Sequence, residues 1–170
     1  MIFLLFSISA NIVIFYLFFY RLEYICCVFF EIFFQMIHRD YLLKMLQDLA
    51  TAISALIVSK KPLTEKQRDV EALYSFFNRP ADFFRSAESD ELLPFLASFD
   101  DDLLLRAEML AGIMYADARC YMGSHNQRID IIRKALMLYQ YVEQRSDQFS
   151  LDRLERIDFL QRQLQDSVTD

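Results

Sequence analysis

The sequence predicts an all-α protein of antiparallel helical hairpins, arranged as a helical array or bundle and preceded by an apolar N-terminal helix. Apolar residues recur every three or four positions along several long stretches, which is the spacing of one helix face. The chain has only 2 Gly, whereas the tight turns of β-hairpins require Gly-containing pairs. The 3 Pro all fall within residues 62–94, so the longer stretches are free of helix breakers.

Residues 1–35 differ in composition from the rest of the chain. They hold nine of the 17 Phe but only three charged residues, and residues 2–20 carry no charge at all. A helix of that length spans about 28 Å at 1.5 Å per residue, which matches the apolar core of a bilayer. One interpretation is therefore an inner-membrane anchor, and Arg21, Arg39 and Lys44 after the span would keep the remaining chain on the cytoplasmic side.

The other interpretation is a misassigned start, with translation beginning at Met36. No Lys or Arg precedes the apolar stretch, so the basic region of a signal peptide is missing. Its Phe, Ile, Leu and Tyr content is what thymine-rich DNA encodes, and a polar helix start follows Met36 at His38-Arg39-Asp40. We favour this interpretation, in which residues 36–170 form a cytoplasmic domain and membrane association is expected only if residues 1–35 are translated.

Charge and motifs argue against several function classes. The formal net charge of −6 at pH 7 provides no general attraction for nucleic-acid phosphates. The 3 Cys form neither a disulfide framework nor a zinc-ligand pattern, and Cys120 is expected in the core. There is no H-E-x-x-H, no Gly-rich phosphate loop and no G-x-S-x-G. We therefore expect a protein that is not an enzyme, needs no cofactor or metal and does not bind nucleic acid.

The most regular helix is predicted for residues 39–61. Asp40 can cap its start, and Pro62 blocks its continuation. Lys60 and Lys61 would lie at the negative end of its dipole. Its apolar face comprises Leu42, Met45, Leu46, Leu49, Ile53, Leu56 and Ile57.

A second helix is predicted to begin at Thr64. Thr64 and Gln67 fit a capping box, in which each side chain binds a free backbone amide at the helix start. Asn78 and Pro80 would end this helix. Residues 80–100 contain two prolines and several large apolar side chains, so we expect short helical turns whose aromatic rings fill gaps between longer helices.

Three longer helices are predicted in the second half of the chain. The aspartates at 100–102 would lie at the positive end of a helix that Gly123 closes with a left-handed cap. A short connection at 124–126 makes the following helix antiparallel to it. The last helix is expected to start near Ser150, with Asp152–Arg156 and Asp158–Arg162 as surface ion pairs.

Residues 109–142 resemble a single tetratricopeptide-type hairpin. Ala116 and Ala135 stand where that repeat has small residues, and Gly123 stands at its turn. Arg128 and Gln140 depart from the pattern, because the repeat has a small residue and a proline there. No second copy follows at a period of about 34 residues, so the resemblance covers one hairpin.

Over most of residues 36–170 the chain also resembles a family of uncharacterised bacterial proteins. The resemblance rests on two motifs, one in the first helix and one in the last, and members of that family begin near the position of Met36. It implies a helical fold and no chemistry. The matching residues are Asp40-Tyr41-Leu42 with Met45, and Ser150, Arg153, Arg156-Ile157 and Leu160.

The candidate partner-binding residues are cationic. Arg119, Arg128, Arg133 and Lys134 are expected on one side of the 103–146 hairpin, where they would receive an acidic peptide or a phosphate. The alternative is an ordinary solvated face.

Other polar residues of the sequence are assigned no chemistry. Glu108 and Asp117 are predicted to be surface carboxylates, and His38 and His125 to be solvated or capping side chains. We expect a protein–protein interaction module whose partner is an unknown protein or peptide, with self-association and a functional membrane tether as alternatives.

Overall fold

The computed structural model describes residues 36–37, 39–99 and 102–169. The chain divides into Met1–Tyr41 and Leu42–Asp170, and the fold reported below is that of the second unit. Residues 1–35 lie outside the described residues. The anchor, the alternative start at Met36 and the domain boundary at residue 35 therefore stay predictions.

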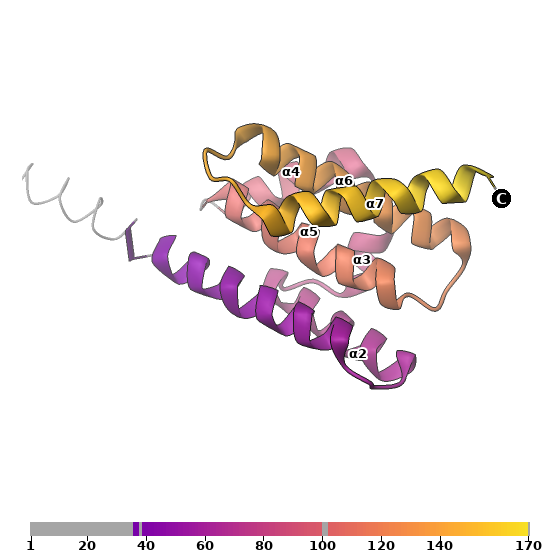
Figure 1. Cartoon of the computed structure of the whole chain (residues 1–170). Coiled ribbons are helices and arrows are strands. Elements are labelled where there is room, and N and C mark those ends of the chain that lie inside the picture. The colour runs from indigo at the N-terminus through magenta and orange to yellow at the C-terminus, as the bar shows by residue number, and fades with distance from the viewer. Residues whose placement is uncertain (1–35, 38, 100–101, 170) are drawn as a thin grey trace, which may run out of the picture. The chain divides into compact units, whose positions relative to one another are not determined.

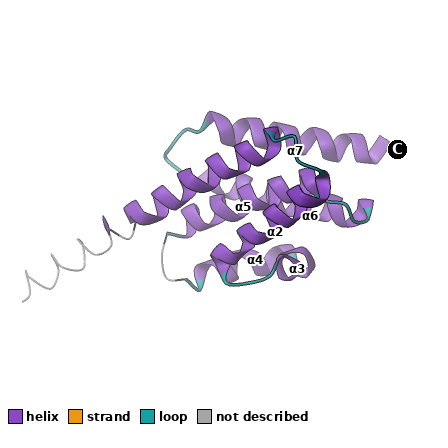
Figure 2. Cartoon of the chain, turned by 90° about the horizontal axis from the view of Figure 1, so that it is seen from below, coloured by secondary structure: helices purple, strands orange, loops and turns teal. Residues whose placement is uncertain are grey.

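Every regular element in the described ranges is a helix, which confirms the predicted all-α class (Figure 2). The tetratricopeptide-like arrangement stays a prediction. In chain order the elements are the first helix (Arg39–Val58), α2 (Leu63–Leu73), the 3-10 helix η1 (Tyr74–Phe77), α3 (Ala81–Ser86), α4 (Ser89–Ala97), α5 (Leu103–Cys120), α6 (His125–Arg145) and α7 (Leu151–Thr169).

The helix α5 lies at the centre of the unit. It runs antiparallel to α6, as the short connection predicts, and α7 packs along α6 (Figure 1). Residues 109–118 of α5 are all buried, which requires neighbours on every side of the helix. Small residues make this possible, because a Cβ at Gly112 would lie only 3.3 Å from Ile53 Cδ1 of the first helix.

The first helix is long and apolar enough, by length and composition alone, to cross a membrane. In the described structure its apolar face is used in the core, since Leu42, Leu49 and Ile53 are buried. Asp48 and Thr51 are exposed on its other side. The predicted amphipathic helix is therefore confirmed, although Asp40 lies inside it and not at its cap.

The short helices α3 and α4 carry the aromatic residues expected to fill gaps. The ring centroid of Phe84 lies 5.7 Å from that of Phe77 and 5.6 Å from that of Phe95, and both pairs meet edge to face. Phe95 and Phe99 also meet edge to face. Such pairs add about 0.5–1.5 kcal/mol beyond the area they bury. The prediction for residues 80–100 is confirmed.

Two predicted helix caps are wrong. The N-cap of α2 is Pro62 without a side-chain hydrogen bond, and Gln67 instead accepts a hydrogen bond from the backbone N–H of Met122. Among the described residues no Gly has a positive φ, so Gly123 is not a left-handed cap. Its small size is needed because a Cβ there would lie 2.5 Å from the ring of Tyr121.

Other predicted features at helix ends are confirmed. The carboxylate of Asp102 accepts hydrogen bonds from the backbone N–H groups of Leu104 and Leu105 at the start of α5. Asp100 and Asp101 lie outside the described residues. Cys120, the last residue of α5, is buried as expected, and burial raises the pKa of its thiol.

Candidate functional site

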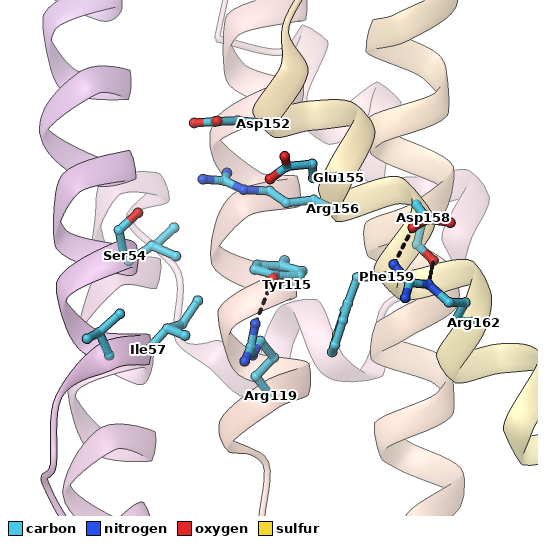
Figure 3. A pocket seen from close by; sticks show the side chains of 12 residues that line it. Ser54, Ile57, Tyr115, Arg119, Asp152, Glu155, Arg156, Asp158, Phe159 and Arg162 are labelled. Carbon is cyan, nitrogen blue, oxygen red and sulfur yellow. Dashed lines mark hydrogen bonds and ion pairs between the residues drawn. The ribbon is translucent and has the colours of Figure 1, made fainter.

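A cavity of about 590 Å³ opens between the first helix, α5 and α7 (Figure 3). We call it the α7 cavity, and its volume lies within the range typical of ligand-binding clefts. Its apolar wall consists of Ile53, Ile57, Val58 and Phe159. The remaining lining residues are Ser54, Tyr115, Arg119, Asp152, Glu155, Arg156, Asp158 and Arg162.

The aromatic rings of Tyr115 and Phe159 meet edge to face at the back of the α7 cavity, with centroids 5.6 Å apart. Tyr115 comes from α5, and Phe159 comes from the middle of α7. Ser54 and Ile57 approach from the first helix on the opposite side (Figure 3). Three separate helices therefore form this site, and a rigid hydrophobic contact fixes its base.

Arg119 is exposed at the last turn of α5, where the negative end of the helix dipole favours a cation. Its guanidinium lies 4.9 Å from the ring centroid of Phe159 and 5.7 Å from that of Tyr115. Its Nη1 donates a hydrogen bond of 2.9 Å to the Tyr115 hydroxyl. Among the described residues no carboxylate pairs with it, so its position is fixed while its charge is not neutralised.

Arg156 reaches into the same site from α7. Its Nη1 donates a hydrogen bond of 3.0 Å to the Tyr139 hydroxyl, and its guanidinium lies 5.6 Å from the ring centroid of Tyr115. It lies beside Gly112, where a Cβ would be in ordinary contact with Nη1 at 3.7 Å. The surface ion pair predicted between Asp152 and Arg156 is therefore wrong, because Arg156 turns inward.

The charge of Arg156 is not cancelled by its hydrogen-bond partner. Burial raises the pKa of Tyr139 to about 12, so this hydroxyl is neutral at physiological pH. Burial also acts to lower the pKa of Arg156, but the contact with Tyr139 and the charge of Asp152 outweigh it and raise that pKa. Arg156 thus remains a cation with one neutral partner.

The other charged residues of the α7 cavity lie along α7. Arg162 pairs with Asp158, which confirms the predicted i,i+4 pair. Asp152 and Glu155 lie at the end of the cavity opposite Arg119 (Figure 3). Arg156 lies at the same end (Figure 3), so two carboxylates and one arginine form an acidic end near the start of α7, and Arg119 forms a basic end.

The structure does not bring the four predicted cationic residues together. Arg119 lines the α7 cavity, and Arg128 donates to the Ala118 carbonyl and to the Gln163 side chain of α7. Arg133 is exposed on α6. Lys134 is only 2% exposed and donates to the Arg85 carbonyl at the end of α3, so the expectation of one cationic face is wrong.

A buried ionic cluster, which sequence analysis missed, lies on the other side of α5. Asp117 is fully buried, and Arg85 donates to its two oxygens at 2.9 and 2.8 Å. The Tyr74 hydroxyl donates to the same carboxylate at 2.9 Å, and Glu71 also pairs with Arg85. We call these four residues the Asp117 network. The prediction of Asp117 as a surface carboxylate is wrong because helices surround α5 at this position.

Glu108 is also partly buried and paired. It accepts from Arg153, which is 3% exposed and also pairs with Glu143 of α6 at 2.6 Å. In the described part of the chain, no buried side-chain nitrogen or oxygen lacks a hydrogen-bond partner. Both ionic clusters are therefore satisfied internally, whereas Arg119 in the α7 cavity has no carboxylate partner among the described residues.

Comparison with known proteins adds no family or relative. No protein family, no curated protein and no solved structure matches the chain. Within residues 36–37, 39–99 and 102–169, no three His, Cys, Asp or Glu side chains are grouped to hold a metal ion.

Proposed function

We propose that this chain is a protein–protein interaction module that binds a segment of a partner protein in the α7 cavity. The observation that carries the proposal is the combination, in one open site, of an apolar wall with a cation held in place but left without a carboxylate partner. Binding sites commonly combine a mostly apolar surface with a few polar groups that fix orientation.

The shape of the site favours a peptide segment. Its α7 residues extend from Asp152 to Arg162, which is about 15 Å along the helix axis at 1.5 Å per residue. This length accommodates roughly three turns of a helix or four to five residues of extended chain. Val58 is 82% exposed at the edge of the cavity and offers an apolar contact to such a segment.

Two tryptophan substitutions test the location of binding. Ser54 lines the cavity, whereas Thr51, one turn earlier on the same helix, does not. Both residues are exposed, and both hydroxyls donate to a carbonyl four residues earlier. Ser54→Trp should block the cavity sterically, while Thr51→Trp adds the same ring outside it.

A library of random peptides displayed on phage is selected against the full chain. We expect enriched peptides to bind the wild type and Thr51→Trp equally, and to bind Ser54→Trp at least about tenfold more weakly, a difference of about 1.4 kcal/mol. The proposal is wrong if no peptide is enriched, or if the enriched peptides bind both variants with equal affinity.

A further inference from the structure

We infer that the bound segment presents a carboxylate to Arg119, with its chain directed from there toward the acidic end of the α7 cavity. This inference rests on the proposed function and specifies the chemistry of the partner. It concerns an Asp or Glu side chain of a peptide, not a free inorganic anion.

The contacts of Arg119 leave its hydrogen-bonding edge available. Its Cζ lies 4.9 Å from the Phe159 ring centroid and 5.7 Å from that of Tyr115, and only one N–H is used, by the Tyr115 hydroxyl. Arginine has five N–H donors in a planar fork that matches the two oxygens of a carboxylate. Because the rings already restrict the side chain, binding costs little further conformational entropy.

The charges that face the cavity indicate the direction of the segment. Arg162 is neutralised by Asp158, and Arg156 bonds to the neutral Tyr139 hydroxyl. Asp152 and Glu155 occupy the far end together with Arg156, and two carboxylates with one arginine leave a net negative charge there that disfavours a carboxylate (Figure 3). A segment with its acidic residue at Arg119 therefore matches the site, and the reverse orientation does not.

The balance of charge favours a carboxylate over a phosphate. The cavity is lined by three arginines and three carboxylates, so it has no excess of positive charge for a dianion. One carboxylate on Arg119 satisfies the fixed cation without bringing a second negative charge near Asp152 and Glu155. The adjacent Ile57 and Val58 would contact an apolar group next to that carboxylate.

A small-molecule titration tests the chemistry directly. The full chain labelled with ¹⁵N is titrated with 3-phenylpropionate, its neutral amide and phenyl phosphate, and the Nε–Hε signal of Arg119 is followed by NMR. Arg119→Gln identifies the signal. Arg133→Gln is the control because Arg133 is an exposed arginine that does not line the cavity.

We expect 3-phenylpropionate to shift the Arg119 signal in the wild type and in Arg133→Gln, with at least fivefold weaker binding of the amide. Absence of a shift up to about 10 mM carboxylate, a concentration at which even weak single contacts are populated, overturns the inference. So does equal binding of the amide, or tighter binding of phenyl phosphate.

The peptide selection distinguishes failure of this inference from failure of the proposed function. Peptides enriched on the wild type and on Arg133→Gln should share an Asp or Glu at one position, and that preference should disappear on Arg119→Gln. Enriched peptides that are blocked by Ser54→Trp but lack an acidic residue would leave the proposed function in place and overturn the carboxylate inference.

Discussion

Arg85 binds a residue of α5 and Arg119 belongs to α5, but the two arginines differ in what balances their charge. The Arg85 side chain is 13% exposed and pairs with Asp117 and Glu71, while exposed Arg119 contacts one hydroxyl and two rings. Asp117 and Arg119 are two residues apart, so at about 100° per residue they point to opposite sides of the helix. On one side the chain neutralises its own arginine, and on the other it leaves an arginine at an open cavity.

This difference separates structural charge from charge available for binding. A buried ion pair is strongly destabilising when only one member is removed, because the remaining charge stays buried without a partner. An exposed arginine in cation–π contact with aromatic rings contributes much less to the free energy of folding. Substitutions on the two sides of α5 should therefore separate stability from binding.

The largest effect is expected for Asp117→Ala. The change removes the buried acceptor that the Arg85 guanidinium and the Tyr74 hydroxyl share, and we expect the free energy of unfolding to fall by about 3–5 kcal/mol. Urea denaturation followed by circular dichroism measures this. Asp82→Ala is the control, because Asp82 also pairs with Arg85 but is 91% exposed, and it should change stability by less than about 1 kcal/mol. Equal effects would show that the Asp117 network is not structural.

A second pair of substitutions applies the same comparison to α7. Arg153→Ala removes a 3% exposed side chain that binds Glu108 and Glu143, and we expect a loss of about 3 kcal/mol. Arg162→Ala removes a 66% exposed arginine from its pair with Asp158 and should cost less than about 1 kcal/mol. Thermal and urea unfolding measure both, and a comparable loss for Arg162 would contradict the role assigned to burial.

Alkaline pH tests whether Tyr139 stays neutral beside Arg156. The folded protein holds this proton up to a pKa of about 12, whereas an unfolded tyrosine loses it near pH 10. The folded state thus binds more protons between these values, so stability should be full below pH 10 and fall by about 2 kcal/mol as pH rises to 12. Urea unfolding over this range measures the fall.

Tyr139→Phe should remove this part of the pH dependence. Buried Tyr74, whose pKa is also raised by burial, should retain its own contribution. Tyr41→Phe, at a tyrosine that is 60% exposed, is the control. An unchanged pH profile in Tyr139→Phe would mean that Tyr139 ionises near its ordinary pKa, and that burial does not hold its proton.

The smallest effect on stability is expected for Arg119→Gln. Its loss removes two cation–π contacts at an exposed position, so the free energy of unfolding should fall by about 1 kcal/mol or less. Urea unfolding measures the free energy of unfolding of Arg119→Gln, with Arg133→Gln as the control. A loss of about 3 kcal/mol, as for a buried ion pair, would place Arg119 with the structural arginines and argue against its role in binding.

The helical elements could be predicted from sequence because apolar spacing reports which face of a helix is buried. The first helix, the Asp102 cap and the hairpin of α5 and α6 followed from local signals within a few residues. The Asp117 network could not be predicted this way. Arg85 is 32 residues from Asp117 in the sequence. Because α5 is buried on all sides around position 117, its residue pattern has no exposed polar face from which the burial of Asp117 could be predicted.

The candidate site was predicted only in part. Arg119 was one of the four predicted cationic residues. That Arg119 and not Lys134 is available at the surface depends on α3, because the Arg85 carbonyl near the end of α3 accepts a hydrogen bond from Lys134. Arg156 resembled the partner of Asp152 because they are four residues apart, whereas its hydrogen bond goes to Tyr139 of α6, 17 residues away in the sequence. Local patterns identify charged residues, but distant packing decides which of them remain available.

Gly112 connects the interior of the protein to the width of the α7 cavity. The missing side chain at this position lies next to Ile53 and Arg156, which both line the cavity, and to the Tyr139 hydroxyl. A methyl group there would lie tightly against Ile53 of the first helix, at 3.3 Å from Cδ1, and in ordinary contact with the other two. The space between α5 and the first-helix wall of the α7 cavity is therefore set in part by the hydrogen atom that takes the place of a methyl group inside the protein.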